Sequence, residues 1–108
     1  WIYAPDLARA LLTLLDASTT KDRLYHLAIE APFDMMAWCE RLRKRYPSFQ
    51  FRESARVKEC NIAPLAPFRT PFSGRRLRDE FGFKPAFTPA TAFDDYMQWL
   101  ATHPRFST

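Results

Sequence analysis

Residues 72–85 read FSGRRLRDEFGFKP, and this stretch holds the clearest helix start and stop signals of the chain. Ser73 is a typical N-cap residue, and the apolar residues after it recur at helical spacing up to Phe81. Gly82 can take the left-handed conformation that ends a helix, and Pro85 prevents the helix from resuming. The stretch therefore predicts a short helix that ends in a tight turn.

The residues after this turn predict a last helix. Thr88 and Pro89 form an N-cap and first-turn pair, and Pro104 ends the helical pattern. The apolar positions of this helix are Phe93, Tyr96, Met97 and Leu100. We expect His103 to cap its final carbonyl groups.

Two further helices are predicted upstream of residue 72. The first covers residues 5–17, where Pro5 suits the first turn and Asp6 complements the positive end of the helix dipole. Its apolar stripe is Leu7, Leu11, Leu14 and Leu15. The second has Asp34 as its N-cap and is stopped by Pro47. Its apolar positions are Met35, Cys39, Leu42 and Tyr46.

Two segments predict strands. Residues 23–29 and 48–53 alternate between apolar and polar side chains and flank one predicted helix, which favours a parallel crossover. Residues 54–72 contain three prolines and no lasting periodicity, which is typical of an irregular loop. The expected fold class is α/β, a small α+β subdomain of about four helices and two or three short parallel strands.

Composition limits the kind of protein. With 108 residues, 47% of them hydrophobic, the chain has room for one folded domain, residues 1–108. No apolar run approaches the roughly 20 residues of a membrane span, and no signal peptide is visible, so we expect a cytoplasmic protein without membrane contacts. Cys39 and Cys60 lack the spacing of a metal or redox motif and are expected to be reduced thiols, with a disulfide as the alternative.

Three segments, in this order, resemble the extended short-chain dehydrogenases/reductases, the NAD(P)-dependent epimerase/dehydratase family. Residues 1–10 resemble the family's strand end and following helix, in which an aspartate stands at the helix start. Residues 24–28 are similar to its next strand, although His26 replaces the usual asparagine and Ala28 the usual glycine. Residues 72–85 resemble its closing helix and turn, and the terminal helix follows.

The resemblance implies the C-terminal, substrate-binding portion of a Rossmann-type enzyme. The N-terminal NAD(P)-binding domain is missing from this sequence, which has two glycines, no Gly-x-Gly and no Tyr-x-x-x-Lys pair. A start at Trp1 without an initiator Met agrees with a fragment. We therefore expect no catalytic, cofactor-binding or metal-binding residue and no activity of the chain alone. The parent protein is expected to use NAD or NADP, and the partners are its own nucleotide-binding domain and a small substrate such as a sugar nucleotide.

Arginines are the candidate substrate-binding residues. In the resembling family the irregular segment contacts the substrate, and a guanidinium binds phosphate or carboxylate groups through two parallel hydrogen bonds. Arg69 is the first candidate, followed by Arg52 and Arg56, and then by Lys58. The alternative is that these are solvated surface residues. His26 lacks a visible carboxylate partner and receives no catalytic role.

Two rival functions stay open. A net charge of +4 and two basic clusters suit a small nucleic-acid-binding domain, although acidic residues interrupt both clusters. The cluster members are Arg41, Arg43, Lys44, Arg45, Arg75, Arg76 and Arg78, and the interrupting residues are Glu40, Asp79 and Glu80. The other rival is a self-associating interaction module, for which a homodimer is expected.

Overall fold

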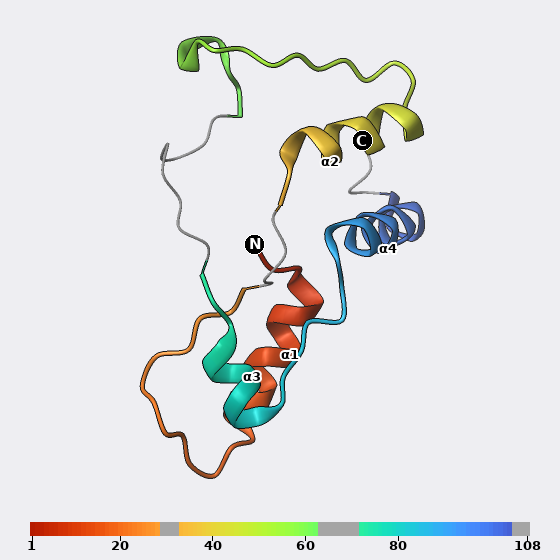
Figure 1. Cartoon of the computed structure of the whole chain (residues 1–108). Helices are drawn as coiled ribbons and strands as arrows, with labels where there is room; N and C mark the ends of the chain where they lie inside the picture. The colour runs from red at the N-terminus through yellow and green to blue at the C-terminus, as the bar shows by residue number, and fades with distance from the viewer. Residues whose placement is uncertain (29–32, 63–71, 105–108) are drawn as a thin grey trace. The chain divides into compact units, whose positions relative to one another are not determined.

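The computed structural model describes residues 1–28, 33–62 and 72–104 (Figure 1). The contacts of the chain divide it into two units, one made of residues 1–33 and 71–108 and the other of residues 34–70. In the described ranges the regular elements are the helices α1 to α4 and one turn of 3-10 helix, η1.

Helix α1, Ala4–Leu15, is held at its N-terminal end by a buried carboxylate. Asp6 is fully buried and accepts hydrogen bonds from the backbone N–H groups of Ala86, at 2.9 Å, and Phe87, at 3.0 Å. Arg9 donates a third hydrogen bond of 2.7 Å to the same side chain. Asp6 therefore fixes the start of α1 to the segment between α3 and α4.

Helix α3, Arg75–Phe81, has the ending that the sequence predicts. Gly82 has φ 66°, in the left-handed region, and its N–H binds the Arg78 carbonyl. The predicted start is displaced by one residue, because Gly74 is the N-cap. Ser73 still contributes, since its hydroxyl accepts a 3.3 Å hydrogen bond from the N–H of Arg75.

Helix α4, Pro89–Thr102, has a reciprocal cap at its start. The Thr91 N–H donates to the Thr88 hydroxyl at 3.2 Å, and the Thr88 N–H donates to the Thr91 hydroxyl at 2.9 Å. At the other end, Nδ1 of His103 lies 2.9 Å from the carbonyl oxygen of Trp99. The predicted roles of Thr88 and His103 are both confirmed.

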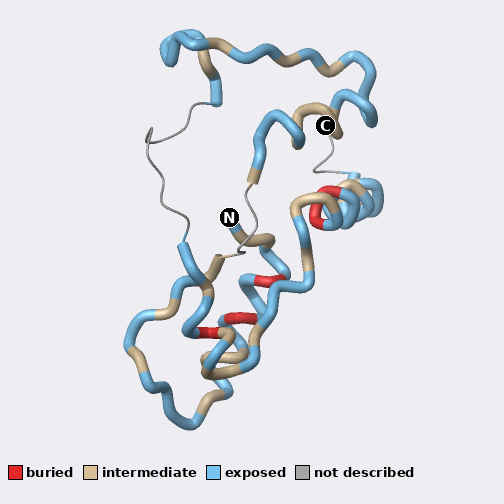
Figure 2. Tube along the Cα trace, viewed as in Figure 1, coloured by how far each residue is buried: buried red, intermediate tan, exposed pale blue. Residues whose placement is uncertain are grey.

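The core of the first unit is small. It consists of Asp6 and Ala10 of α1, Leu77 of α3, and Ala92 and Phe93 of α4, shown as red segments in Figure 2. Small side chains at two of these positions allow close packing of the backbone. Most leucines of α1 lie outside this core.

The second unit begins with α2, Met35–Arg45. Its predicted N-cap is confirmed, because an oxygen of Asp34 accepts a 2.8 Å hydrogen bond from the N–H of Met36. An extended segment follows, and then η1, Val57–Glu59. None of the described residues of this unit is buried.

The predicted α/β fold with parallel strands is wrong for the part of the chain that the structure describes, which is helical. Residues 24–28 and 49–53 are extended but form no strand ladder, and they belong to different units. Alternating side chains indicate an extended, half-buried segment, whereas a strand also needs a second backbone about 4.8 Å away. The Leu24 carbonyl accepts a 3.0 Å hydrogen bond from the side chain of Arg76, where a strand would accept one from a neighbouring backbone N–H.

Candidate functional site

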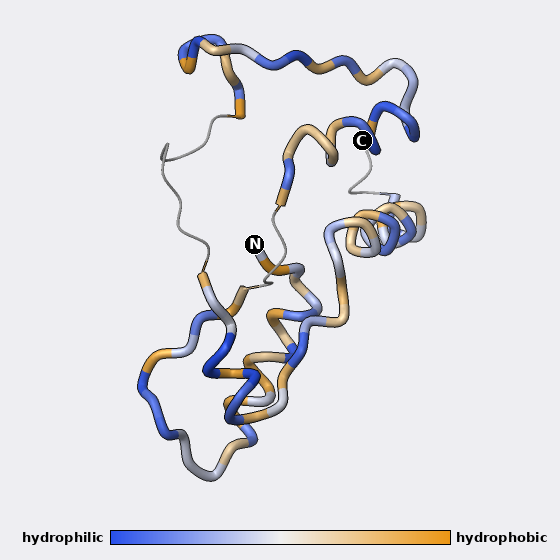
Figure 3. Tube along the Cα trace, viewed as in Figure 1, coloured by the Kyte–Doolittle hydropathy of each residue, from blue (hydrophilic) through white to orange (hydrophobic). Residues whose placement is uncertain are grey.

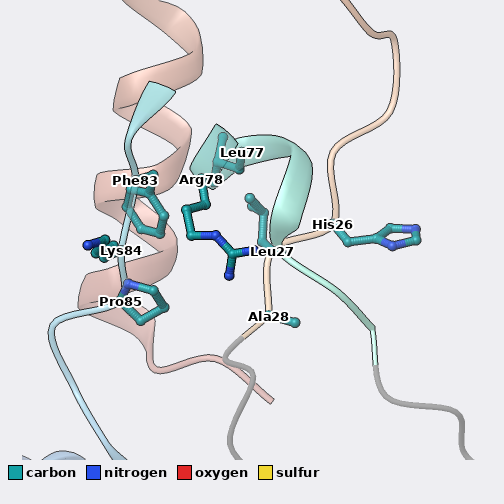
Figure 4. A pocket seen from close by; sticks show the side chains of 9 residues that line it. His26, Leu27, Ala28, Leu77, Arg78, Phe83, Lys84 and Pro85 are labelled. Carbon is teal, nitrogen blue, oxygen red and sulfur yellow. The ribbon is translucent and has the colours of Figure 1, made fainter. Parts of the chain in front are cut away.

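A cavity of about 260 Å³ lies in the first unit, between residues 26–28 and α3 (Figure 4). Residues 26–28 form one wall, residues 83–85 form another, and α3 contributes Leu77 and Arg78. The remaining lining residue is Gly74, the N-cap of α3. The cavity is therefore built by the same stretch that carries the strongest fold signals.

The lining is mostly apolar and includes two cationic residues, Arg78 and Lys84. Figure 4 shows the Arg78 side chain extending into the space between Leu27 and Pro85, whereas the His26 ring points away. The His26 ring packs edge-on against Phe72, with 4.8 Å between ring centres. Nε of Arg78 also lies 3.5 Å from a carboxylate oxygen of Asp79. Such a space suits a small apolar group that bears a negative charge.

Gly74 sets the width of this cavity wall. A Cβ atom at this position would stand 3.0 Å from the carbonyl oxygen of Ala28, which is backbone and cannot rotate away. A side chain here would therefore require the Ala28 backbone to shift by a few tenths of an ångström. Sequence reasoning missed this role, because the close approach involves a segment 46 residues earlier in the chain.

A hydrogen-bonded cluster around Glu80 joins α3 to residues 21–25. Glu80 accepts from the Tyr25 hydroxyl at 2.6 Å and from the Lys21 N–H at 2.8 Å. Desolvation raises the pKa of the Glu80 carboxyl, but these two hydrogen bonds outweigh it and leave the pKa below its ordinary value. Desolvation and the bond to Glu80 raise the pKa of Tyr25. Glu80 is thus a charged acceptor and Tyr25 a protonated donor, which makes the cluster structural rather than acid–base machinery.

A second tyrosine joins α1 to α4. The Tyr3 hydroxyl donates a 2.8 Å hydrogen bond to Asp95, and its ring packs edge-on against Phe87 with 5.0 Å between centres. Burial, followed by the hydrogen bond to Asp95, raises the pKa of Tyr3 to about 12. The hydroxyl therefore keeps its proton near neutral pH and acts as a fixed donor.

The sequence-predicted arginines of the second unit meet at one carboxylate. Nη1 of Arg56 lies 3.0 Å from Oε1 of Glu59, and Nη2 of Arg52 lies 3.6 Å from Oε2 of the same residue. Both arginine side chains are more than 70% exposed, so these ion pairs are worth little in isolation. Lys58 is an exposed member of η1. Arg69 lies outside the described residues.

The guanidinium groups of Arg52 and Arg56 share the Glu59 carboxylate, which leaves an excess of one positive charge at an exposed position. A phosphate or carboxylate can compete with Glu59 for these donors through bidentate hydrogen bonds. Sequence reasoning proposed both arginines from their residue type but did not identify Glu59 as their shared partner, because Glu53 is equally near in the sequence.

The described part of the chain shows no gathering of three or more His, Cys, Asp or Glu side chains that could hold a metal ion. Cys39 and Cys60 are both free thiols. None of the helices in the described ranges combines the length and hydropathy needed to cross a bilayer. Comparison of the chain with protein-family models, curated proteins and solved structures gave no match.

Proposed function

We propose that this chain is the substrate-binding, C-terminal portion of an NAD(P)-dependent epimerase/dehydratase of the extended short-chain dehydrogenase/reductase kind. It contacts an anionic small molecule, such as a sugar nucleotide, and depends on a separate nucleotide-binding domain for cofactor and catalysis. The observation that carries the proposal is the buried carboxylate of Asp6, which binds the backbone of Ala86 and Phe87.

This observation matters because it joins two segments that carry the resemblance. Asp6 belongs to the opening segment, and its partners directly follow the closing segment, 80 and 81 residues later in the chain. Each segment alone is a short match. A shared hydrogen-bonded core supports the interpretation that both belong to one structural unit.

The second unit supports a substrate role through its charge. Arg52 and Arg56 are exposed and share a single acidic partner, so an incoming diphosphate finds donors that need little reorganisation. Of the seven basic residues in the two clusters, Arg43 pairs with Glu40 at 2.6 Å and Arg76 with Asp22 at 3.6 Å, while Arg75 and Arg78 share Asp79 at 3.7 and 3.5 Å. This pairing favours a local anion contact over a broad nucleic-acid surface.

Calorimetric titration of the chain with NADH and with NADPH tests whether cofactor binding requires the separate nucleotide-binding domain. We expect no micromolar binding and no turnover of sugar nucleotides, because the sequence has neither the glycine-rich turn nor the Tyr-x-x-x-Lys pair. Micromolar binding of either cofactor, or turnover by the chain alone, contradicts the proposal.

Substitution of the candidate arginines in the full-length protein tests the substrate contact. Loss of a bidentate phosphate contact costs about 1.5–3 kcal/mol, so Arg69→Ala and Arg56→Ala should each raise KM about tenfold or more. Arg75→Ala is the matched control, an exposed arginine on α3 that shares the Asp79 carboxylate with Arg78. An unchanged KM in Arg69→Ala and Arg56→Ala, or an equal increase in Arg75→Ala, shows that these are ordinary surface residues.

A further inference from the structure

The amphipathic helix α1 is oriented with its apolar side outward. Its leucines are 36% (Leu7), 47% (Leu11), 57% (Leu12) and 78% (Leu15) exposed, while its acidic residue Asp6 is fully buried. Figure 3 shows the apolar positions of α1 as orange bands along the helix. A surface helix normally does the reverse and buries its apolar stripe against its own core.

The orientation is fixed by hydrogen bonds rather than by chance packing. Rolling α1 to bury its leucines would remove Asp6 from Ala86 and Phe87 and leave buried polar groups without partners. Arg9 holds the same side of the helix, since it binds Asp6 and lies 5.4 Å from the ring centre of Phe83. The leucines must therefore be covered from outside, or stay in water at a cost of about 25 cal/mol per Å².

The outward surface, here called the leucine face, has a self-complementary pattern. It consists of the exposed residues Ala4, Leu7, Ala8, Leu11, Leu12 and Leu15. These six positions are symmetric about the midpoint of the helix between residues 9 and 10, both along the axis and, at 100° per residue, around it. A two-fold axis through that midpoint places Ala4 opposite Leu15 of a second copy, and Ala8 opposite Leu11.

This pairing sets a small side chain against a large one at each central position. Alternating small and large residues interdigitate well, and an isologous interface requires that residue i meets residue j while j meets i. Leu7 and Leu12 exchange in the same way on the two flanks. The spacing of Ala4, Ala8, Leu11 and Leu15 is also the three-and-four spacing of antiparallel helix packing.

Charge favours a second copy over a lipid surface. Helices that lie on membranes carry Lys and Arg on their polar side, but the only basic residue of α1 is Arg9, which is bound to Asp6. The leucine face itself has no charged residue. Two chains of net charge +4 can therefore meet there without placing like charges in contact.

We propose that the leucine face of α1 is a homodimer interface in which two copies of the helix pack antiparallel about a two-fold axis between residues 9 and 10. A 12-residue helix is about 18 Å long, which puts a contact through α1 alone at the small end of specific interfaces. The dimer is expected to dissociate on dilution through the micromolar range. This inference does not require the proposed function, although both use the hydrogen bonds of Asp6 to Ala86 and Phe87.

Sedimentation of the chain between about 1 μM and 1 mM tests the interface. The wild-type chain should change from monomer to dimer, and Leu11→Glu should weaken dimerisation about tenfold or more, because it places a charge against an apolar partner. Leu24→Glu is the matched control, an equally apolar residue that is 61% exposed and lies outside α1. A wild-type chain that stays monomeric throughout overturns the proposal. So does a dimer that Leu11→Glu leaves intact.

A mixing experiment tests the antiparallel register. At a concentration where the wild-type chain is dimeric and Ala8→Lys and Leu11→Glu are each monomeric, an equimolar mixture of the two should form a heterodimer. In it, Lys at 8 meets Glu at 11 and the second Ala8–Leu11 contact stays native. Circular dichroism confirms that each variant is helical before mixing. Recovery of the dimer, weakened by salt, supports the register. Failure of two folded variants to associate overturns it.

Discussion

At the scale of single residues, one carboxylate organises the first unit. Asp6 would be an ordinary first-turn acid if it only complemented the helix dipole, as its position in the sequence predicts. In the structure it is fully buried and accepts three hydrogen bonds, two of them from backbone N–H groups near the far end of the chain. The sequence could not show this, because the partners are backbone atoms of residues whose side chains play no part.

Asp6→Ala should be the most damaging single polar substitution in this unit. It removes two backbone hydrogen bonds and the ion pair with Arg9, and it leaves buried N–H groups without acceptors. We expect a loss of roughly 3 kcal/mol of unfolding free energy in urea titrations. Asp94→Ala, an exposed acid on α4, should change it by less than about 0.5 kcal/mol. Equal effects of the two substitutions would contradict the role given to Asp6.

Tyr3 should make the folded state sensitive to alkaline pH. Its pKa is about 12 in the folded chain and 10.0 ordinarily, so between these values the unfolded state has released a proton that the folded state still holds. The contribution is therefore complete below about pH 10 and is lost as the pH rises toward 12. Urea titrations at about pH 9 and pH 11.5 should show this loss.

Tyr3→Phe should flatten this dependence, whereas Tyr46→Phe, an exposed tyrosine of the second unit, should leave it in place. Because Tyr25 also has a raised pKa, some alkaline sensitivity should persist in Tyr3→Phe and disappear when Tyr25→Phe is added. An alkaline profile identical in wild type and in Tyr3→Phe would contradict the assignment.

At the scale of elements, signals that act within a few residues were predictable and those that act between distant segments were not. The caps at Asp34 and Thr88 and the left-handed Gly82 are confirmed, because each is complete within one turn of the chain. The strands at 23–29 and 48–53 were wrong, although residue 29 itself lies outside the described ranges. A strand depends on a neighbouring backbone that no local pattern reveals.

The candidate site shows the same division. The exposed, basic character of Arg52 and Arg56 follows from residue type, and the structure confirms that they are exposed. Their common partner Glu59, and the close approach of Gly74 to the Ala28 carbonyl, depend on the path of the chain. The chemical character of each side chain could therefore be predicted from the sequence, but its contact partners could not.

Gly82 offers a clean test of the ending of α3. Its φ of 66° is strained for residues with a Cβ, but a Cβ added there would meet nothing within 4 Å. Gly82→Ala should therefore cost about 1 kcal/mol of unfolding free energy from backbone strain alone. Gly82→Asn should cost less, because asparagine tolerates the left-handed conformation. If both variants were as stable as the wild type in thermal and urea unfolding, the left-handed turn would not be needed.

At the scale of the whole molecule, the described residues bury very little. Among the described residues, the core of the first unit has five members and the second unit has none. Exposed leucines on α1 and extended segments without a strand partner are surfaces that another protein component can cover. The proposed nucleotide-binding domain would explain the small buried core, and the proposed dimer through α1 would explain the exposed leucines.

The sequence encoded immediately before Trp1 tests the proposed function most directly. We predict a glycine-rich strand-to-helix turn and a Tyr-x-x-x-Lys pair within about 150 to 250 residues upstream, the length of one nucleotide-binding domain. That result would supply the cofactor and proton-transfer groups that this chain lacks. A start codon directly before Trp1, or an unrelated domain in that place, would contradict the assignment to an NAD(P)-dependent epimerase/dehydratase.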